Sequence, residues 1–273
     1  MDNKTQKKLA ALFSLLDETS QNSANIIIAE ILNNIDDAEQ FLNSLQESGA
    51  PLIRKRIHQI QAITVIRKRR REFAEKIKDG SLPLLEGLVE VHLQWYDSDN
   101  AQLILNSYCE LQKQAAKVNV HNIDKLAYFM RKMSFKTSER NGLVPDCYCL
   151  GLVIEERIGV DLILCALAKC LAEQCGLQLE VIKMVDGFAL LDENNAALSP
   201  LHNWRIYNNV PHERYKRWDK RMILELAAAR LFLCAVGTDS FRYVNTIGNA
   251  LGAIIGVDSL EFLPFPYDSG SKK

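Results

Sequence analysis

Apolar residues in the first half of the chain recur at the three- and four-residue spacing that places them on one face of a helix. These stripes lie, in chain order, at residues 9–16, 27–35, 41–45, 53–63, 84–91, 103–111 and 126–130. Turn-forming residues such as Gly49 to Pro51 and Asp79 to Pro83 separate them, and connections this short are typical of antiparallel helices. The pattern predicts an N-terminal helical domain over residues 1–140.

The pattern changes in the second half of the chain. Two further stripes predict helices that end at Gly159 and Gly176, because glycine is favoured just past a helix end. Leu177, Leu179 and Val181, with Val185 further on, then alternate with polar neighbours, and residues 188–191 form a compact apolar run; both patterns are typical of strands. We therefore predict a core of helices and a small antiparallel sheet over residues 141–219.

Helical spacing returns after residue 220 and continues on both sides of Gly237. It predicts a helical hairpin followed by a tail from Pro264, over residues 220–273. Residues 200–218, between the sheet and the hairpin, are polar and aromatic and are predicted to be irregular. The fold class predicted for the whole chain is α+β and mostly helical.

Composition and charge narrow the range of functions. The chain is 48% hydrophobic and 25% charged, which is typical of a globular protein. Its formal net charge is -1, so no overall field attracts nucleic acid or an anionic membrane. No uncharged run approaches the roughly 20 residues that span a bilayer. The seven cysteines are spread along the chain, which is typical of free thiols in a reducing compartment. We predict a cytoplasmic protein without a membrane partner.

Four segments in the middle of the chain carry a resemblance to a known family. They read, in order, PDCYCLGLVIEERIGVDL (145–162), LAEQCGL (171–177), VDGFAL (185–190) and LSP (198–200). The series resembles the SirB-type branch of the transglutaminase-like superfamily in bacteria, whose segments appear in the same order without gaps. Residues 84–88 resemble that family's leading helical domain, and Met222 to Asp239 resemble the helix after its core.

The resemblance implies a papain-like core in which a cysteine, a histidine and an aspartate act together. The helix start and the histidine lower the thiol pKa, and the aspartate orients the imidazole. In this chain the nucleophile position falls at Leu162 or its neighbour Ile163, the histidine position is Gly187 and the aspartate position is Ser199. The resemblance therefore implies a degenerate core with a vestigial pocket beside Leu162, Gly187 and Ser199. We predict a non-catalytic scaffold, binding or regulatory module that acts on a protein partner and needs no cofactor.

An enzyme is the alternative interpretation. Cys165 lies one helical turn after the expected nucleophile, and His202 follows Ser199 closely enough to serve as a displaced base. Together they could form a thiol hydrolase or acyltransferase. Periodicity places Cys165 on the inward face of its helix, whereas a reactive cysteine needs an exposed, electropositive setting. A structural role is therefore favoured for Cys165, and a loop position for His202.

Two sequence patterns resemble metal-binding motifs, but their residues do not have the spacing that the motifs require. Cys147 and Cys149 are followed by cysteines at five-residue steps, which point in different directions on a helix, whereas structural zinc prefers two closely spaced pairs. Residues 97–100 begin like a calcium loop but lack the glycine and the closing glutamate. We predict no metal.

The strongest local charge lies between Arg54 and Lys78 and sums to +8. Its basic residues are Arg54, Lys55, Arg56, Arg67, Lys68, Arg69, Arg70, Arg71, Lys76 and Lys78, set against Glu72 and Glu75. Five consecutive basic residues point all round a helix, and no aromatic platform accompanies them. A solvated helix is favoured, an acidic protein partner is second, and nucleic acid is least favoured.

Aromatic residues gather in the predicted irregular segment. They are Trp204, Tyr207, His212, Tyr215 and Trp218. Aromatic side chains that carry a polar group are favoured where the ring packs against apolar residues and the polar group contacts solvent. A loop folded over the core is favoured over a binding surface.

Overall fold

The computed structural model describes residues 3–18, 20–34, 50–138, 143–238 and 241–256, and these ranges fall into two compact units. The first unit comprises Met1–Arg70 and the second Arg71–Lys273, with the division inside helix α4 (Pro51–Lys78). The stripe predicted at 41–45 and the tail from Pro264 lie outside the described residues.

The first unit is helical, as its apolar spacing predicts. Helix α1 (Asn3–Ser14) is followed by α2 (Gln21–Asn33), whose first turn is capped by the Ser20 hydroxyl, and then by the start of α4. Burial of one apolar face of each helix provides the main stabilisation. The buried residues are Leu9, Phe13, Leu16, Ile27, Ile28, Ile31, Leu32, Ile57 and Ile60.

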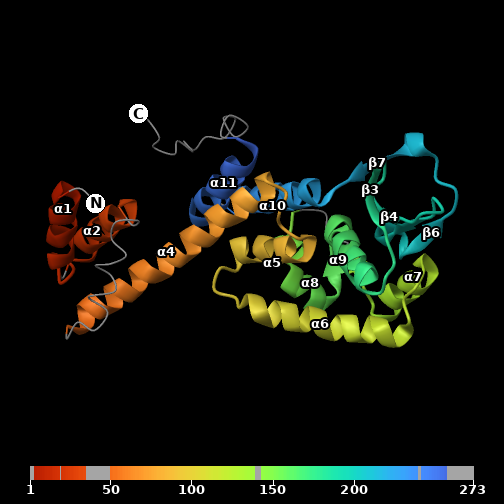
Figure 1. Ribbon diagram of the computed structural model, residues 1–273, viewed down its shortest axis with the longest axis horizontal. Coiled ribbons are helices and arrows are strands. Elements are labelled where there is room, and N and C mark those ends of the chain that lie inside the picture. Colours follow the sequence, from red (N-terminus) through yellow and green to blue (C-terminus); the bar gives the residue numbers. More distant parts are fainter. Residues whose placement is uncertain (1–2, 19, 35–49, 139–142, 239–240, 257–273) are drawn as a thin grey trace. The chain divides into compact units, whose positions relative to one another are not determined.

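The second unit contains most of the chain (Figure 1). Its helices are α5 (Leu84–Trp95), α6 (Ala101–Val118), α7 (Ile123–Lys132), α8 (Leu150–Glu156), α9 (Asp161–Gln174), α10 (Lys220–Gly237) and α11 (Phe241–Ile255). Short 3-10 turns lie at Pro145–Tyr148, Pro200–His202 and His212–Arg214. Within the described residues, none of the helices is both long enough and apolar enough to span a bilayer.

One antiparallel sheet completes the second unit. Its strands are β3 (Glu180–Met184), β4 (Phe188–Leu191), β5 (Ala197–Ser199), β6 (Arg205–Tyr207) and β7 (Tyr215–Trp218), in the spatial order β6-β5-β4-β3-β7. Two residues of β1 (Lys136–Thr137) pair separately with β2 (Ile158–Gly159). The predicted fold class, mostly helical α+β with a small antiparallel sheet, is confirmed.

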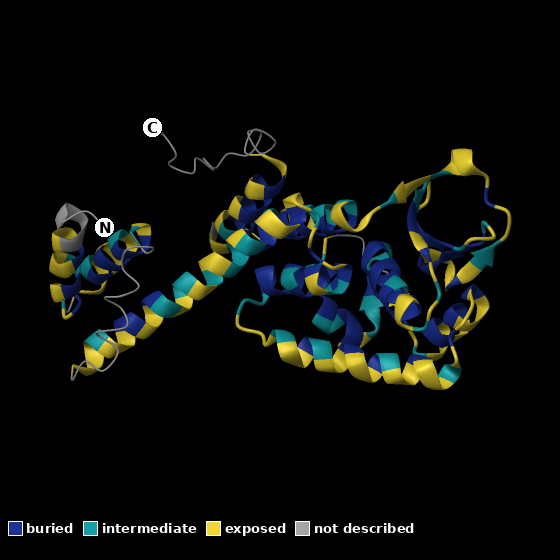
Figure 2. Cartoon of the chain, in the orientation of Figure 1, coloured by how far each residue is buried: buried dark blue, intermediate teal, exposed yellow. Residues whose placement is uncertain are grey.

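Helix α9 lies at the centre of this unit. Leu162 to Ala168 are all buried along it, and Figure 2 colours most of the helix dark blue for buried residues. It ends where the sequence predicts, because Gly176 adopts φ 79° and Leu177 N–H closes the helix onto the Ala172 carbonyl. Since α9 packs on β3 and β4 on one side and on α5 to α8 on the other, it positions the candidate site.

A single core joins the three segments predicted from the sequence. It runs from Phe73 through α9 and the sheet to Ile254 in α11. Helices α5 and α10 interdigitate within it so closely that a Cβ atom at Gly87 would lie 2.3 Å from Leu224 Cδ1. The division into domains at residues 1–140, 141–219 and 220–273 stays a prediction. All three segments contribute buried residues to the same core.

Strands β6 and β7 lie in the segment predicted to be irregular. Each is short, lies at an edge of the sheet, and has side chains that are mostly half-buried or exposed. An edge strand needs no regular alternation of apolar residues, so the sequence lacked the signal that marks β3 and β4. Trp204, just before β6, is fully buried.

Candidate functional site at the start of helix α9

The fold brings together the three positions that the family resemblance singles out. Leu162 lies in the first turn of α9, Gly187 immediately precedes β4, and Ser199 ends β5. The antiparallel pairing of β4 with β5 places Ser199 near the start of β4. All three are buried, with Leu162 2% and Ser199 5% exposed.

Asp161 connects the start of α9 with the start of β4. It is the first residue of α9, and its carboxylate accepts the backbone N–H of Leu162 at 2.9 Å and that of Phe188 at 2.7 Å. A carboxylate is favoured at a helix N-terminus, where backbone N–H groups lack partners. Asp161 was not among the predicted site residues, although an acidic residue that opens a mostly apolar helix is a usable signal in the sequence.

Gly187 has no room for a side chain. A Cβ atom there would lie 2.5 Å from Asp161 Oδ2 and 2.2 Å from Leu201 Cδ1. The position that corresponds to the histidine in the family pattern is therefore occupied by the Asp161 carboxylate and by Leu201. Asp161 can reach the N–H of Phe188 because residue 187 is glycine.

Ser199 and His202 contact each other. The Ser199 hydroxyl and His202 Nδ1 share a hydrogen bond of 3.2 Å, and the imidazole also packs edge-on against Tyr207 at 5.7 Å between ring centroids. His202 itself is exposed. Because the two residues stand three apart at the start of a 3-10 turn, the bond stabilises that turn locally.

Cys165 lies on the inward face of α9, as predicted. Its side chain is 0% exposed, and burial, aided by the nearby Asp161 charge, raises the pKa of the thiol well above its ordinary value. A nucleophilic cysteine reacts as the thiolate. Burial therefore disfavours the reactive form of Cys165.

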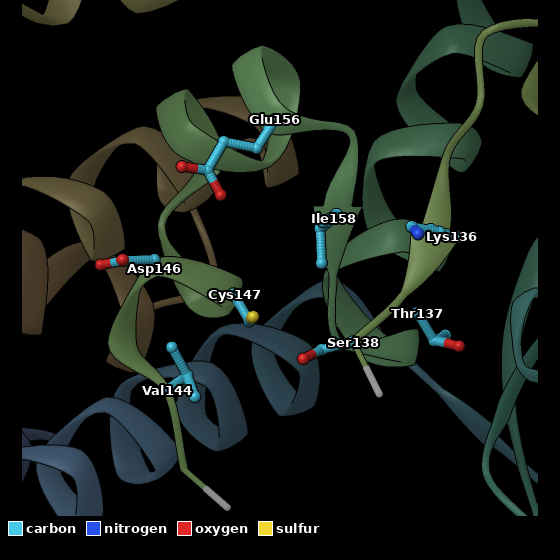
Figure 3. Close-up of a pocket in the computed structure, with 8 residues that line it drawn as sticks. All are labelled: Lys136, Thr137, Ser138, Val144, Asp146, Cys147, Glu156 and Ile158. Atoms are coloured by element: carbon cyan, nitrogen blue, oxygen red, sulfur yellow. The ribbon is translucent and has the colours of Figure 1, made fainter. Parts of the chain in front are cut away.

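The remaining buried cysteines have similar settings. Burial raises the pKa of Cys170 to about 12 and that of Cys149 well above its usual range. Cys147 contributes to a cavity of about 230 Å³, where its sulfur lies near Ser138 and below Glu156 (Figure 3). Within the described ranges, no group of three or more His, Cys, Asp or Glu side chains is arranged to hold a metal ion.

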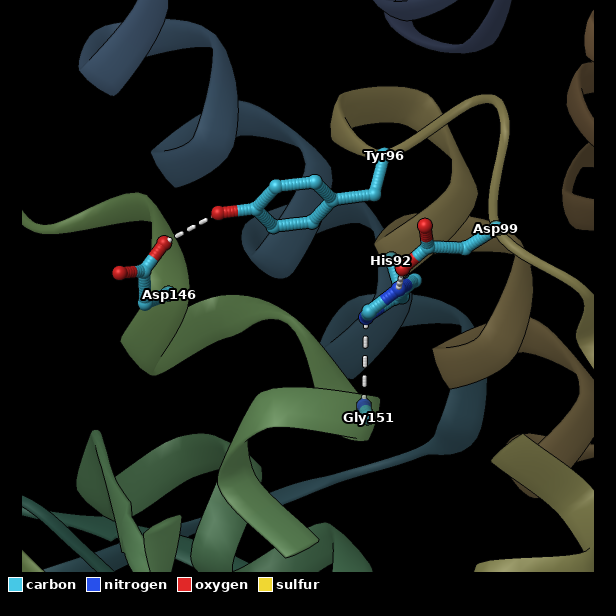
Figure 4. Close-up of polar contacts among 5 residues, drawn as sticks. All are labelled: His92, Tyr96, Asp99, Asp146 and Gly151. Atoms are coloured by element: carbon cyan, nitrogen blue, oxygen red, sulfur yellow. Dashed lines mark hydrogen bonds and ion pairs between the residues drawn. The ribbon is translucent and has the colours of Figure 1, made fainter. Parts of the chain in front are cut away.

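A buried histidine joins three elements that are distant in the sequence (Figure 4). His92 of α5 is 1% exposed; its Nδ1 accepts the Gly151 N–H of α8 at 3.2 Å, and its Nε2 lies 3.0 Å from Asp99 Oδ2. Since Nδ1 is the acceptor, the proton lies on Nε2 and is donated to Asp99. Beside it, the Tyr96 hydroxyl donates to Asp146 at 2.7 Å. Residues 97–100 form the connection between α5 and α6, and nothing in the sequence indicates the contact that Asp99 makes there.

The basic residues of α4 have unequal roles. Arg56 is 5% exposed and its Nη1 donates to the Leu16 carbonyl at 2.7 Å, so it stabilises the first unit. Arg69 and Arg70 are half-buried. The exposed members are Arg54, Lys55, Arg67, Lys68, Arg71, Lys76 and Lys78.

Comparison with known families assigns the central segment. A sequence model of the transglutaminase-like superfamily matches residues 99–210. The chain contains a transglutaminase-like domain. That domain extends from the loop before α6 to just after β6, and so it includes Asp161, Gly187 and Ser199, whereas α5, α10 and α11 lie outside the match. No curated protein and no solved structure gives a significant match to the chain.

Proposed function

We propose that the transglutaminase-like domain is of the SirB type, has lost its catalytic triad, and acts as a non-catalytic scaffold, binding or regulatory module for a protein partner. The positions of nucleophile, base and orienting acid carry Leu162, Gly187 and Ser199. None of these side chains supplies a thiolate or an imidazole. None of the seven cysteines, all of which lie in the described part of the chain, forms a disulfide, which supports a cytoplasmic location.

The contact between Asp161 and residue 187 carries this proposal. In a working triad the imidazole must lie within hydrogen-bond distance of the nucleophile. Here the Asp161 carboxylate lies where the first atom of a side chain at 187 would be, and it is held there by two backbone N–H groups. The site is thus closed by a hydrogen-bonded arrangement and not merely by missing side chains.

Thiol labelling tests the proposal against the enzyme alternative. With iodoacetamide at pH 7, we expect the exposed Cys109 to be alkylated first and the buried Cys165 to react about 100-fold or more slowly, since it must wait for local opening. Peptide mass spectrometry of the native full chain measures the seven rates, and the guanidinium-unfolded chain is the control. Rapid, selective alkylation of Cys165 in the native chain would refute the proposal.

Turnover gives an independent readout of the same question. The full chain should hydrolyse p-nitrophenyl acetate, and transfer an acyl group from a glutaminyl peptide to an amine, no faster than Cys165→Ala does. The matched control is Cys109→Ala, which removes an exposed thiol outside the site. Activity that is lost in Cys165→Ala and kept in Cys109→Ala would establish an enzyme.

The exposed basic residues of α4 favour a second candidate role, contact with an acidic protein partner. We expect Arg67→Glu combined with Lys68→Glu to weaken binding of a polyglutamate peptide about tenfold or more at low salt, with the difference shrinking between about 0.02 M and 0.3 M NaCl. Fluorescence anisotropy measures this, and Lys125→Glu on α7 is the control. Affinity independent of salt would exclude the role, and tighter binding of single-stranded DNA than of polyglutamate would favour nucleic acid.

A further inference from the structure

The two edges of the five-stranded sheet differ in what packs against them. At one edge β6 packs against α7, whereas at the other β7 packs against β3 and the 3-10 turn that precedes it (Figure 1). The Tyr215 N–H closes that turn onto the His212 carbonyl. Within the part of the chain that the structure describes, Lys216 to Trp218 make hydrogen bonds only to β3. The outer backbone groups of these residues are therefore available to pair with a further strand.

The side chains of β7 alternate between the two faces of the sheet. Trp218 packs on the inner face, edge-on against the Phe188 ring at 5.0 Å between centroids. Arg217 lies on the outer face, where its Nε is 2.8 Å from Glu180 Oε2 of β3. Lys216 shares the inner face with Trp218. Since Lys216 and Arg217 point to opposite faces and both are exposed, solvent reaches both faces of β7 at these residues.

The inner face carries an uncompensated positive charge at this edge. Lys216 stands directly opposite Lys183 of β3, and like charges in that position destabilise a sheet. Lys183 Nζ lies over the Phe188 ring at 4.5 Å. Among the described residues, neither lysine has an ion pair, in contrast to Arg217. A carboxylate beside β7 would neutralise the repulsion between Lys183 and Lys216.

Charge decides which occupant fits this edge. Residues 212–221 contain five Lys and Arg against two Asp and Glu. If a second copy of this chain paired its β7 antiparallel with this one, Lys216 of each copy would lie opposite Arg217 of the other. Such like-charge pairs are unfavourable, and basic residues on an edge strand oppose self-pairing. An acidic strand of another protein meets the opposite charge.

We propose that β7 is the docking edge for an extended, acidic segment of a partner protein, which adds to the sheet as a sixth strand antiparallel to β7. An acidic side chain lies opposite Lys216, at about 5 Å between Cβ atoms, and a β-branched side chain lies opposite Trp218. In an antiparallel pair the residue opposite Trp218 comes two positions before the acid. The assignment rests on the proposed function, since it gives the binding module its partner chemistry.

Fluorescence anisotropy of the full chain with the fluorescein-labelled peptide Gly-Thr-Ile-Thr-Glu-Thr-Gly tests this assignment. At low salt we expect this peptide to bind about tenfold or more tightly than the same peptide with Lys in place of Glu. Lys216→Glu should reverse that preference, whereas Lys125→Glu, a matched charge reversal at an exposed position of α7, should keep it. A preference that survives Lys216→Glu would overturn the assignment. So would no binding up to about 1 mM, because the basic residues would then only protect the edge from pairing.

Backbone methylation separates strand addition from attraction between charges alone. Successive N–H groups of a strand point alternately toward and away from its neighbour. N-methylation of Ile and Glu in the peptide blocks one set of N–H groups, and N-methylation of the three Thr residues blocks the other. We expect one methylated peptide to lose about tenfold or more in affinity and the other to bind within about threefold of the parent. Equal affinities of the two methylated peptides would overturn strand addition.

The fold is controlled in the same experiments. Lys216→Glu replaces a like-charge pair by an opposite-charge pair with Lys183, so the variant should unfold at the same temperature as the parent chain or at a higher one. Circular dichroism measures this. The peptide comparisons use the unmodified chain, so they decide the assignment even if the variant fails to fold.

The exposed basic residues of α4 are the alternative site for the same peptide. Arg67→Glu combined with Lys68→Glu, in the first unit, should leave its affinity unchanged. Loss of binding in that variant, together with no effect of Lys216→Glu, would transfer the peptide to α4 and overturn the assignment to β7. The thiol and turnover measurements decide the non-catalytic proposal separately, because neither depends on β7.

Discussion

Replacing Trp204 by alanine is expected to lower the free energy of unfolding of the second unit by about 3 to 5 kcal/mol. The indole is fully buried, and its Nε1 donates to the Phe135 carbonyl at 2.7 Å. The Trp204 carbonyl accepts Arg131 Nη1 at 2.9 Å. The substitution therefore removes a large apolar volume and leaves a buried carbonyl without its donor.

Guanidinium unfolding followed by tryptophan fluorescence measures this effect, because Trp95 and Trp218 also lie in the second unit and still report on it. Trp204→Phe is the matched control, since it keeps most of the buried volume and should cost less. A loss below about 1 kcal/mol for Trp204→Ala would mean that the loop carrying Trp204 is not part of the core.

Introducing the family's histidine at Gly187 is expected to destabilise the second unit by about 1 to 3 kcal/mol. The new side chain would collide with Asp161 Oδ2 and Leu201 Cδ1. Leu201 is exposed enough to move aside, whereas the Asp161 carboxylate is held by two backbone N–H groups. Overpacking at this site also breaks the bond to Phe188.

A double-mutant cycle isolates that collision. Gly187→His should cost less when it is combined with Asp161→Ala than alone, because the carboxylate is then absent. Denaturant titrations give the four free energies of unfolding. Gly187→Ala, which adds only a methyl group at the same position, should also destabilise the unit, but by less than Gly187→His. If Gly187→His proved neutral, residue 187 would have room for an imidazole, and the Asp161 carboxylate would not close the site.

Much of the fold could be predicted from the sequence, because burial and periodicity coincide. Helix α9 carries an unbroken apolar run from Leu162 to Ala168 and is followed by Gly176, and β3 and β4 each bury consecutive apolar residues. Strands β6 and β7 could not be predicted in this way, since their stability comes from backbone pairing at the sheet edges.

The candidate sites depend on contacts between residues far apart in the chain. Asp161 and Phe188 are 27 residues apart, and His92 and Gly151 are 59 apart. A sequence shows that an acid opens a helix, but not which backbone N–H it will reach.

The shared core has a practical consequence for recombinant fragments. A piece limited to the matched residues 99–210 would lack Leu88 and Phe232, which complete the interior on either side. The apolar residues that α5 and α10 normally cover would be exposed to solvent, which would favour aggregation of the fragment during expression. The shortest soluble derivative should therefore begin before Phe73 and extend through Ile254.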